Sequence, residues 1–386
     1  MKKVLLTAMA LLTIASASVF GMYGANSDWI DFLVHGNQLR ARMQQFGFVL
    51  GNDMIKGTVG FRSEGTTLGA IMNTTTVTPD GSATKQFFDF LPTVSVGIGY
   101  TSDVFGIGLG YNYTYKHNNV PVSTKNGYGL SIHTPVLAIN AINDSLRIAI
   151  PIQVAVKNGD IANISDKEKY MGISMDPQIR YYTGIEAFNE IRLYVKYGMN
   201  QYTSQAGVKQ TASSFGFELR PYFGATVGDV ALKPFVKIGY DTALDAKGKV
   251  GAASTRVSSS SDVYYREPVA GEATYDSNPW ELRLIPTLGL SANSDIVSLY
   301  LEAGVGYVAN DTGRKLNNGA NGITHKLGWS SYGEIYITPV KDLEWYFEAE
   351  IGNYNFEVEA VADRNIGDLN VQFNASTGIT WYLPAL

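Results

Sequence analysis

The sequence predicts an all-β fold: a transmembrane antiparallel up-and-down β-barrel of about 14 strands, within a range of about 12–16. Three observations lead there. Apolar and polar residues alternate with a period of two almost to the C-terminus, the alternating runs are about 9–13 residues long, and short and long connections follow one another in turn. Soluble domains usually have strands of about 5–6 residues, whereas a tilted strand crossing a bilayer needs about 9–11.

The first 21 residues have the layout of a secretory signal peptide. Lys2 and Lys3 form a basic head, residues 4–14 (VLLTAMALLTI) form an apolar run too short to span a bilayer as a helix, and small residues follow. Cleavage after Ala17 or after Gly21 fits equally. The chain therefore divides into a signal peptide (1–21), a segment of open role (22–54) and the barrel (55–386). Residues 22–54 form either a periplasmic or luminal segment or the first strands, with 51–53 as a turn.

Residues 104–116 (VFGIGLGYNYTYK) illustrate the alternation that defines each strand. One parity carries Phe, Ile, Leu and three Tyr, and the other carries three glycines at 106, 108 and 110. The apolar parity contains no Asp, Glu, Lys or Arg in the strands that start near 93, 104, 146, 191, 215, 232, 282, 297, 329, 343 and 371. An Arg or Lys facing lipid costs about 2–4 kcal/mol at the bilayer midplane, which explains its exclusion from one face.

The connections support the same architecture. Residues 101–103 are a short connection and 116–127 a long one; the pattern repeats along the chain, and 242–279 and 309–322 are among the long connections. Short periplasmic turns opposite long extracellular loops are typical of outer-membrane barrels. A strand near 55–72, added to those after residue 93, completes about 14.

The polar parity predicts a charged interior with two opposed walls. The basic wall consists of Arg147, Arg180, Arg192, Lys196, Arg220, Lys233 and Lys237, with Asp176 and Glu218 as its acids. The acidic wall consists of Glu281, Glu302, Glu334, Glu344, Glu348 and Glu350, with Arg283 as its base. Such walls create a transverse field suited to passing small polar solutes or ions. The alternative is that the charges pair and simply fill the barrel.

Aromatic residues gather near the predicted strand ends and predict girdles at the lipid headgroups. They are Tyr111, Tyr113, Tyr115, Tyr197, Tyr240, Trp280, Tyr307, Trp329, Trp345, Trp381 and Tyr382. Their rings are apolar and their tips polar, which suits the membrane interface. Carbohydrate stacking by a secreted binding protein is the alternative.

The sequence predicts no enzyme, cofactor site or metal site. The four histidines, of which His133 is expected to face the lumen, fall in no catalytic or metal-binding motif: His35, His117, His133 and His325. Ser331 with His133, or acidic pairs near Glu344 and Glu348, are the remaining catalytic candidates. The absence of cysteine excludes a disulfide scaffold and a lipoprotein anchor, and the net charge of −5 argues against a nucleic-acid partner.

The N-terminal run MKKVLLTAMALLTIASASVFGMYGANSDWIDFLVHGNQLRARMQQFGFVLGND and the tail STGITWYLPAL resemble the variable surface proteins of Brachyspira-type spirochaetes. The resemblance implies an abundant outer-membrane surface antigen with variant copies, exposed to host antibodies. It carries no catalytic residues. The C-terminus departs from the common barrel ending in Phe, since Trp381 and Tyr382 precede Leu-Pro-Ala-Leu.

The resulting expectation is an integral outer-membrane β-barrel, a major variable surface antigen with general porin activity. The alternatives are a specific transporter with a luminal N-terminal plug, a barrel hydrolase and a soluble extracellular β protein. The expected partners are outer-membrane lipid, small polar solutes or ions, and host antibodies or surfaces that meet the long loops. Homo-oligomerisation stays open.

Overall fold

The computed structural model describes residues 45–52, 54–64, 73–77, 85–89, 91–118, 128–160, 169–203, 209–249, 274–315, 321–341, 343–353 and 371–381. The predicted signal peptide and residues 22–44 lie outside this part of the chain. All regular elements described are β-strands. No helix in this part is long and apolar enough to cross a membrane.

The first ten strands run from β1 to β10. They are β1 (Gln45–Gly51), β2 (Ile55–Glu64), β3 (Asn73–Val77), β4 (Lys85–Asp89), β5 (Leu91–Thr101), β6 (Gly106–Asn118), β7 (Tyr128–Ala141), β8 (Leu146–Asp160), β9 (Lys169–Met175) and β10 (Gln178–Tyr182). The remaining strands are β11 (Phe188–Thr203), β12 (Lys209–Phe223), β13 (Ala225–Val227), β14 (Val230–Ala243), β15 (Trp280–Asn293), β16 (Val297–Lys315), β17 (Asn321–Val340), β18 (Leu343–Gly352) and β19 (Gln372–Trp381).

The main sheet is an antiparallel meander of 17 strands, with β3 and β4 forming a separate hairpin. Strands β9 and β10 are two parts of one pass between β8 and β11, and β13 continues β12 against β14. The 17 strands less these two continuations give 15 passes. The structure therefore has one pass more than the 14 predicted. The additional pass is β1, which pairs with β2. Part of the open segment 22–54 is thus a strand.

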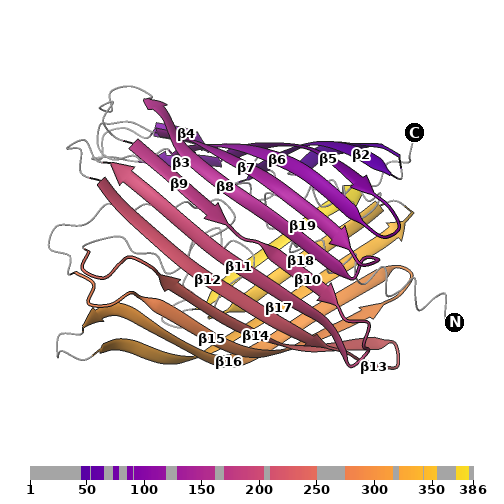
Figure 1. Cartoon of the computed structure of the whole chain (residues 1–386). Coiled ribbons are helices and arrows are strands. Elements are labelled where there is room, and N and C mark those ends of the chain that lie inside the picture. The colour runs from indigo at the N-terminus through magenta and orange to yellow at the C-terminus, as the bar shows by residue number, and fades with distance from the viewer. Residues whose placement is uncertain are drawn as a thin grey trace.

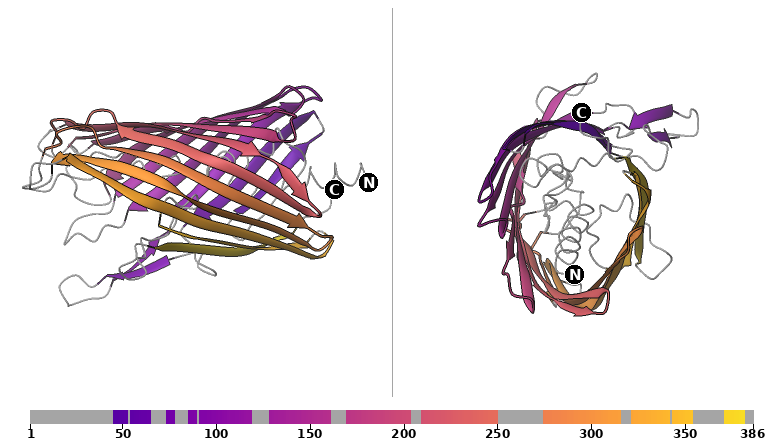
Figure 2. Two further views of the ribbon diagram at one scale, coloured as in Figure 1. Left: turned by 90° about the horizontal axis from the view of Figure 1, so that it is seen from below. Right: turned by 90° about the vertical axis from the view of Figure 1, so that its right-hand side faces the viewer.

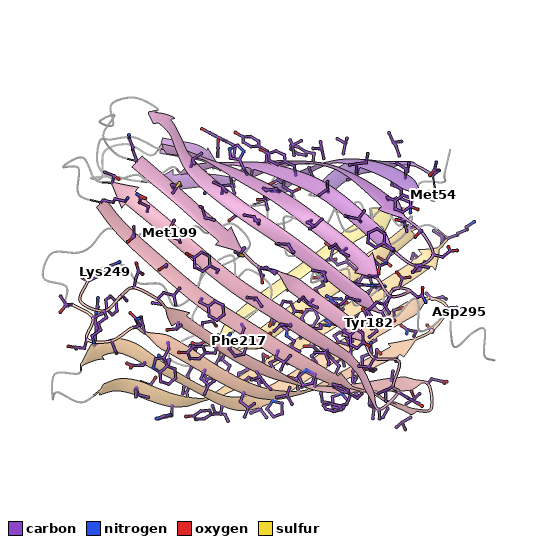
Figure 3. The ribbon with its side chains drawn as sticks, viewed as in Figure 1. Met54, Tyr182, Met199, Phe217, Lys249 and Asp295 are labelled. Carbon is purple, nitrogen blue, oxygen red and sulfur yellow. The ribbon has the colours of Figure 1, made fainter. Side chains whose placement is uncertain are left out.

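The sheet curls round on itself (Figures 1 and 2), with its strands inclined to the long axis. Strands β1 and β19 form its two edges, and no ladder joins them within the described residues. The short turns gather at one end. Figure 3 places Met54, Tyr182 and Asp295 at this end and Lys249 at the other, where the long connections begin.

Several strands are longer than the 9–13 residues that the alternation predicts. Strand β16 has 19 residues and β17 has 20, so both strands extend into the connection predicted at 309–322, where Ala309, Asn310 and Asp311 of β16 still pair with β17. That boundary was wrong because alternation stops where both faces become polar, whereas backbone pairing continues. Asn310 and Thr324 meet in this extension, with Thr324 Oγ1 donating to Asn310 Oδ1 at 2.5 Å.

Side-chain burial follows the predicted parity, and strand β15 displays it most clearly. Leu284 and Leu288 are each 46% exposed, whereas Arg283 and Ile285, on either side of Leu284 in the sequence, are 1% and 0% exposed. Successive side chains of a strand point to opposite faces, so one face of the curled sheet is apolar and open and the other is polar and enclosed. This arrangement inverts that of a soluble protein, whose polar side chains face water.

Strand β6 repeats this alternation in the segment 104–118. Ile107 and Leu109 are exposed, whereas Gly106 and Gly108 lie on the enclosed face. Gly108 stands opposite Gly99 of β5, so this patch of the inner wall carries no side chain.

Candidate functional site on the inner face

Four arginines form one cross-strand row on the enclosed face near the short-turn end. Arg147 of β8 stands opposite Arg180 of β10, Arg180 opposite Arg192 of β11, and Arg192 opposite Arg220 of β12. The register that pairs Leu219 with Ile238 puts Lys237 of β14 opposite Arg220. Directly opposed side chains of a sheet have Cβ atoms about 4.5–5.5 Å apart, so these cations are close neighbours.

Two carboxylates bind two members of this row from their own strands. Arg192 donates through Nε and Nη2 to the two carboxylate oxygens of Glu190, at 2.5 and 3.0 Å. Arg220 donates through Nε to Glu218. Both acids are buried, so these are enclosed, charge-assisted hydrogen bonds rather than screened surface pairs.

Tyrosines alternate with the arginines and support their guanidinium planes. The Cζ atoms of Arg147, Arg192 and Arg220 lie 5.2, 4.4 and 4.8 Å from ring centroids. The respective rings are those of Tyr182, Tyr222 and Tyr194. Cation–π contacts of this kind are stronger where water is excluded. On the inner face, tyrosine rings therefore hold these three guanidinium groups in place.

Arg180 is the exception in the row. It is 2% exposed, and its Nε and Nη1 atoms have no hydrogen-bond partner among the described residues. In the same part of the chain, Arg147 likewise has a buried Nε without a partner. A guanidinium stays charged at any ordinary pH, so these are buried cationic donors facing other cations.

The remaining cations of the predicted basic wall also lie on this face. Lys237 reaches Glu302 of β16 at 3.7 Å, a contact across the boundary between the two predicted walls. Lys233 and Lys196 share the inward parity of β14 and β11 and are partly buried.

Arg283 lies at the centre of a second buried charge network. Its Nη1 binds Asp241 and, at 2.8 Å, Glu281, and its Nη2 lies 3.9 Å from Glu218. The residue is 1% exposed. The one base of the predicted acidic wall thus joins acids from three strands.

The acidic side is held by tyrosines as well as by cations. Glu334 of β17 stands directly opposite Glu348 of β18, and Tyr332 donates its hydroxyl to Glu334. Tyr300 donates in the same way to Glu302. Glu334, Glu348 and Glu350 are buried, and Glu344 shares their inward parity.

The charge balance assumed for the basic wall was wrong. Glu190 and Asp241 also face inward and are buried, in addition to Asp176 and Glu218. They were missed because residues 183–190 read as a connection and Thr242 as the start of a loop, whereas β11 begins at Phe188 and β14 continues to Ala243. That these walls line a pore stays a prediction.

The predicted girdle residues with described side chains lie on the open face. Tyr111, Tyr307 and Trp345 are 38%, 44% and 45% exposed. The others are partly buried, namely Tyr113, Tyr115, Tyr197, Tyr240, Trp280 and Trp329. The side chain of Trp381 and the whole of Tyr382 lie outside the described residues. Two interfacial girdles stay a prediction.

His133 does not face the interior as expected. It stands opposite Tyr113 on the open face, and its Nδ1 lies 2.5 Å from Tyr111 Oη. Strand β7 is apolar on both parities, which hides the alternation; Ile132 and Val136 occupy the enclosed face instead. Tyr307 Oη and His325 Nδ1 form a similar pair on β16 and β17, at 2.6 Å.

The catalytic candidates Ser331 and His133 do not come together. Ser331 on β17 is exposed and donates to the Glu302 carbonyl, whereas His133 lies on β7 with strands β8 to β16 between them in the meander. Within the described ranges, no group of three or more His, Cys, Asp or Glu residues could hold a metal ion.

Comparison with known families decides the chain's classification. The model of the Serpulina hyodysenteriae variable surface protein family matches residues 2–382. The chain belongs to this family. A comparison with curated proteins finds no match. The family's description is that of surface proteins and not of enzymes, which agrees with the scattered catalytic candidates.

In this family member, hydrogen bonds fix the two ends of the connection between β14 and β15, one end to β12 and both ends to each other. Asp245 accepts from the Ser213 backbone amide at 2.8 Å and binds Lys249 Nζ at 2.6 Å. Asn278 Oδ1 accepts from the Ala246 and Lys247 amides, both at 2.9 Å. The connection therefore leaves the sheet from a hydrogen-bonded base.

The electrostatics of this base favour an ionised Asp245. Partial burial raises the pKa of its carboxyl, but the hydrogen bonds from Lys249 and Ser213 outweigh burial and hold the pKa below its usual range. The ion pair at the loop base is therefore complete at neutral pH.

Proposed function

We propose that this variable surface protein is an integral outer-membrane β-barrel, whose strands cross the bilayer and whose long connections present variable surface to the host. The single observation that carries the proposal is the inverted burial of the strands. On β15, Leu282 and Leu284 are open while Arg283 between them is enclosed. Lipid is the environment that accepts the open apolar face, and a closed barrel satisfies the backbone without water.

The orientation follows from the connections. Outer-membrane barrels keep short turns in the periplasm and long loops outside the cell. The connection at 244–279 is longer than any of the turns at the Met54 end, so it would lie outside the cell, within reach of antibodies. Variation among related copies should concentrate there, because loops tolerate change better than packed strands.

Porin activity is the second part of the proposal. A barrel of about 14–16 strands is wider than the eight-stranded kind that side chains can fill. The charged inner face would favour passage of small polar solutes or ions. The ion pairs on that face support a second candidate, a surface antigen without conductance, because Arg192, Arg220 and Arg283 are already bound to carboxylates.

Extraction tests the membrane part directly. We expect the protein to stay in the membrane fraction after high salt and alkaline carbonate and to dissolve only with detergent. Release by salt or carbonate would contradict the barrel and favour a soluble extracellular β protein.

Conductance separates the two functional candidates. We expect the purified protein to produce discrete single-channel steps in a planar lipid bilayer. An inserted, correctly oriented protein that produces no steps would refute the porin activity and leave a barrel that only displays its loops.

A further inference from the structure

We infer that the row Arg147, Arg180, Arg192 and Arg220, called here the arginine row, binds a small oxyanion such as phosphate or a carboxylate. The inference rests on the proposed barrel only in that its enclosed face must admit solutes. The first reason is the spacing of the row, because each arginine stands directly opposite the next across four neighbouring passes. Like charges in directly opposed positions destabilise a sheet unless something neutralises them.

Among the described residues, the protein's own acids neutralise only half of the row. Both carboxylate oxygens of Glu190 accept hydrogen bonds from Arg192, and Glu218 accepts one from Arg220. Glu190 also attracts Arg180 electrostatically, but it makes no hydrogen bond to it. Four arginines and two bound glutamates leave an excess of positive charge at the Arg147–Arg180 end.

The other groups around this end do not remove the excess. The register that pairs Met175 with Tyr197 and Gln178 with Tyr194 puts Asp176 opposite Lys196. On the inward face, Gln178 separates Asp176 from Arg180. Asp144 accepts a hydrogen bond from Asn140, the residue opposite Arg147, at the β7–β8 turn. Gln178, the inward residue that precedes Arg180 on β10, is neutral.

Unused donors mark where the anion would bind. Arg180 is 2% exposed, and within the part of the chain that the structure describes its Nε and Nη1 have no hydrogen-bond partner, nor has Nε of the neighbouring Arg147. An unsatisfied buried donor is costly, and more so when it is charged. Since arginine cannot release its proton, a bound anion would both accept from these donors and offset the excess positive charge.

The geometry of the donors defines the ligand class. A guanidinium presents its N–H groups as a planar fork that matches the oxygens of a carboxylate or phosphate. Two adjacent forks from neighbouring strands suit a compact anion with two or more oxygens better than chloride. The nearby Tyr182 ring stacks on Arg147 and is therefore occupied by the protein itself. The ligand class is thus defined by the oxyanion alone, without an aromatic or sugar group.

Binding is tested on the full chain folded in detergent micelles, by isothermal titration with sodium phosphate and, in a second arm, sodium acetate at constant ionic strength. We expect saturable binding to the unaltered chain in at least one arm. Arg180→Gln should weaken it by about 10-fold or more, because it removes a charged, buried fork. Arg180→Lys should weaken it less, since the charge remains.

Arg314→Gln is the matched control. Arg314 also stacks on a tyrosine, with its Cζ 4.2 Å from the Tyr275 ring, but it lies at the loop end of β16. Its affinity should equal that of the unaltered chain. If Arg180→Gln fails to fold, as judged by heat-dependent electrophoretic mobility, Arg147→Gln carries the same prediction.

Three results would overturn the inference: no saturable binding in either arm, equal binding by Arg180→Gln and the unaltered chain, or an equal loss in Arg314→Gln. The titration needs no ion flow. A chain that binds phosphate without forming channels would keep the oxyanion site and refute only the porin activity. A chain that forms channels without binding either anion would keep the porin activity and refute the oxyanion site.

Discussion

Among single residues, Arg283 is the charge on which the interior depends most. It is 1% exposed and contacts acids from β12, β14 and its own strand. Space for the guanidinium comes from Gly239, since a Cβ added there would lie 2.6 Å from Arg283 Nη2. The backbone of β14 thus approaches the charge network as closely as only glycine allows.

Arg283→Gln should therefore be strongly destabilising. Removing one partner of a buried charge network typically costs about 3–5 kcal/mol. We expect a clearly lower midpoint of thermal unfolding in micelles, and Asp241→Asn in the same chain should recover part of the loss. Arg314→Gln at the loop end should have little effect. A midpoint unchanged in Arg283→Gln would show that the network contributes nothing to stability.

Asp245 provides the residue-scale prediction for pH. Its folded pKa lies below the unfolded value of about 3.9, so its contribution to stability is complete above that value and is lost as the pH falls through the folded pKa. Carbon-13 NMR of the labelled carboxyl should give a pKa below the usual range. Lys249→Met should raise it, and Lys247→Met, which removes an exposed lysine, should not. A normal value in the unaltered chain would contradict the account.

At the scale of the strand, the two faces should respond oppositely to charge. Leu288→Arg places a cation on the open face within β15 and should cost about 2–4 kcal/mol in the free energy of folding into lipid vesicles. The same change at Val340, at the end of β17 beside a short turn, should cost about 0–1 kcal/mol. Denaturant titrations in vesicles measure both. Equal costs at the two positions would contradict a membrane crossing.

The strand scale also marks how far the sequence is informative. Alternation together with the sequence of short and long connections located the 13 passes from residue 91 onward, because opposite faces of a strand differ in polarity. It failed for His133, since β7 is apolar on both parities, and for the ends of β16 and β17, where both faces are polar. Strand β1 could be identified only through its pairing with β2.

The candidate site was predictable only in composition. Parity placed the arginines on the inner face, but the row depends on register across four passes, and register is set by turn geometry and backbone pairing that alternation does not encode. Glu190 was missed because it lies close to the first residue of its strand. The pairing of Arg283 with Asp241 depends on neighbouring strands and on Gly239, so no local motif reveals it.

At the scale of the whole molecule, the fold divides structural and variable tasks. The enclosed face holds a connected set of charges and tyrosines, the open face is apolar, and the long connections gather at the end marked by Lys249 (Figure 3). In the proposed barrel, each region would meet a different selection: packing inside, lipid outside and antibodies at the loops. A member of a variable surface family can then change its loops without disturbing its wall.

The central claim, that alternate residues of each strand meet lipid, is tested most directly by a cysteine scan of β15. The chain has no cysteine, so each variant carries a single spin label. In lipid vesicles, labels at 282, 284 and 288 should be accessible to oxygen and inaccessible to a water-soluble nickel reagent, and labels at 285, 287 and 289 should not share this profile. A period-two oscillation of this kind is the result we predict. Equal access of the nickel reagent to both sets would contradict the membrane-spanning barrel.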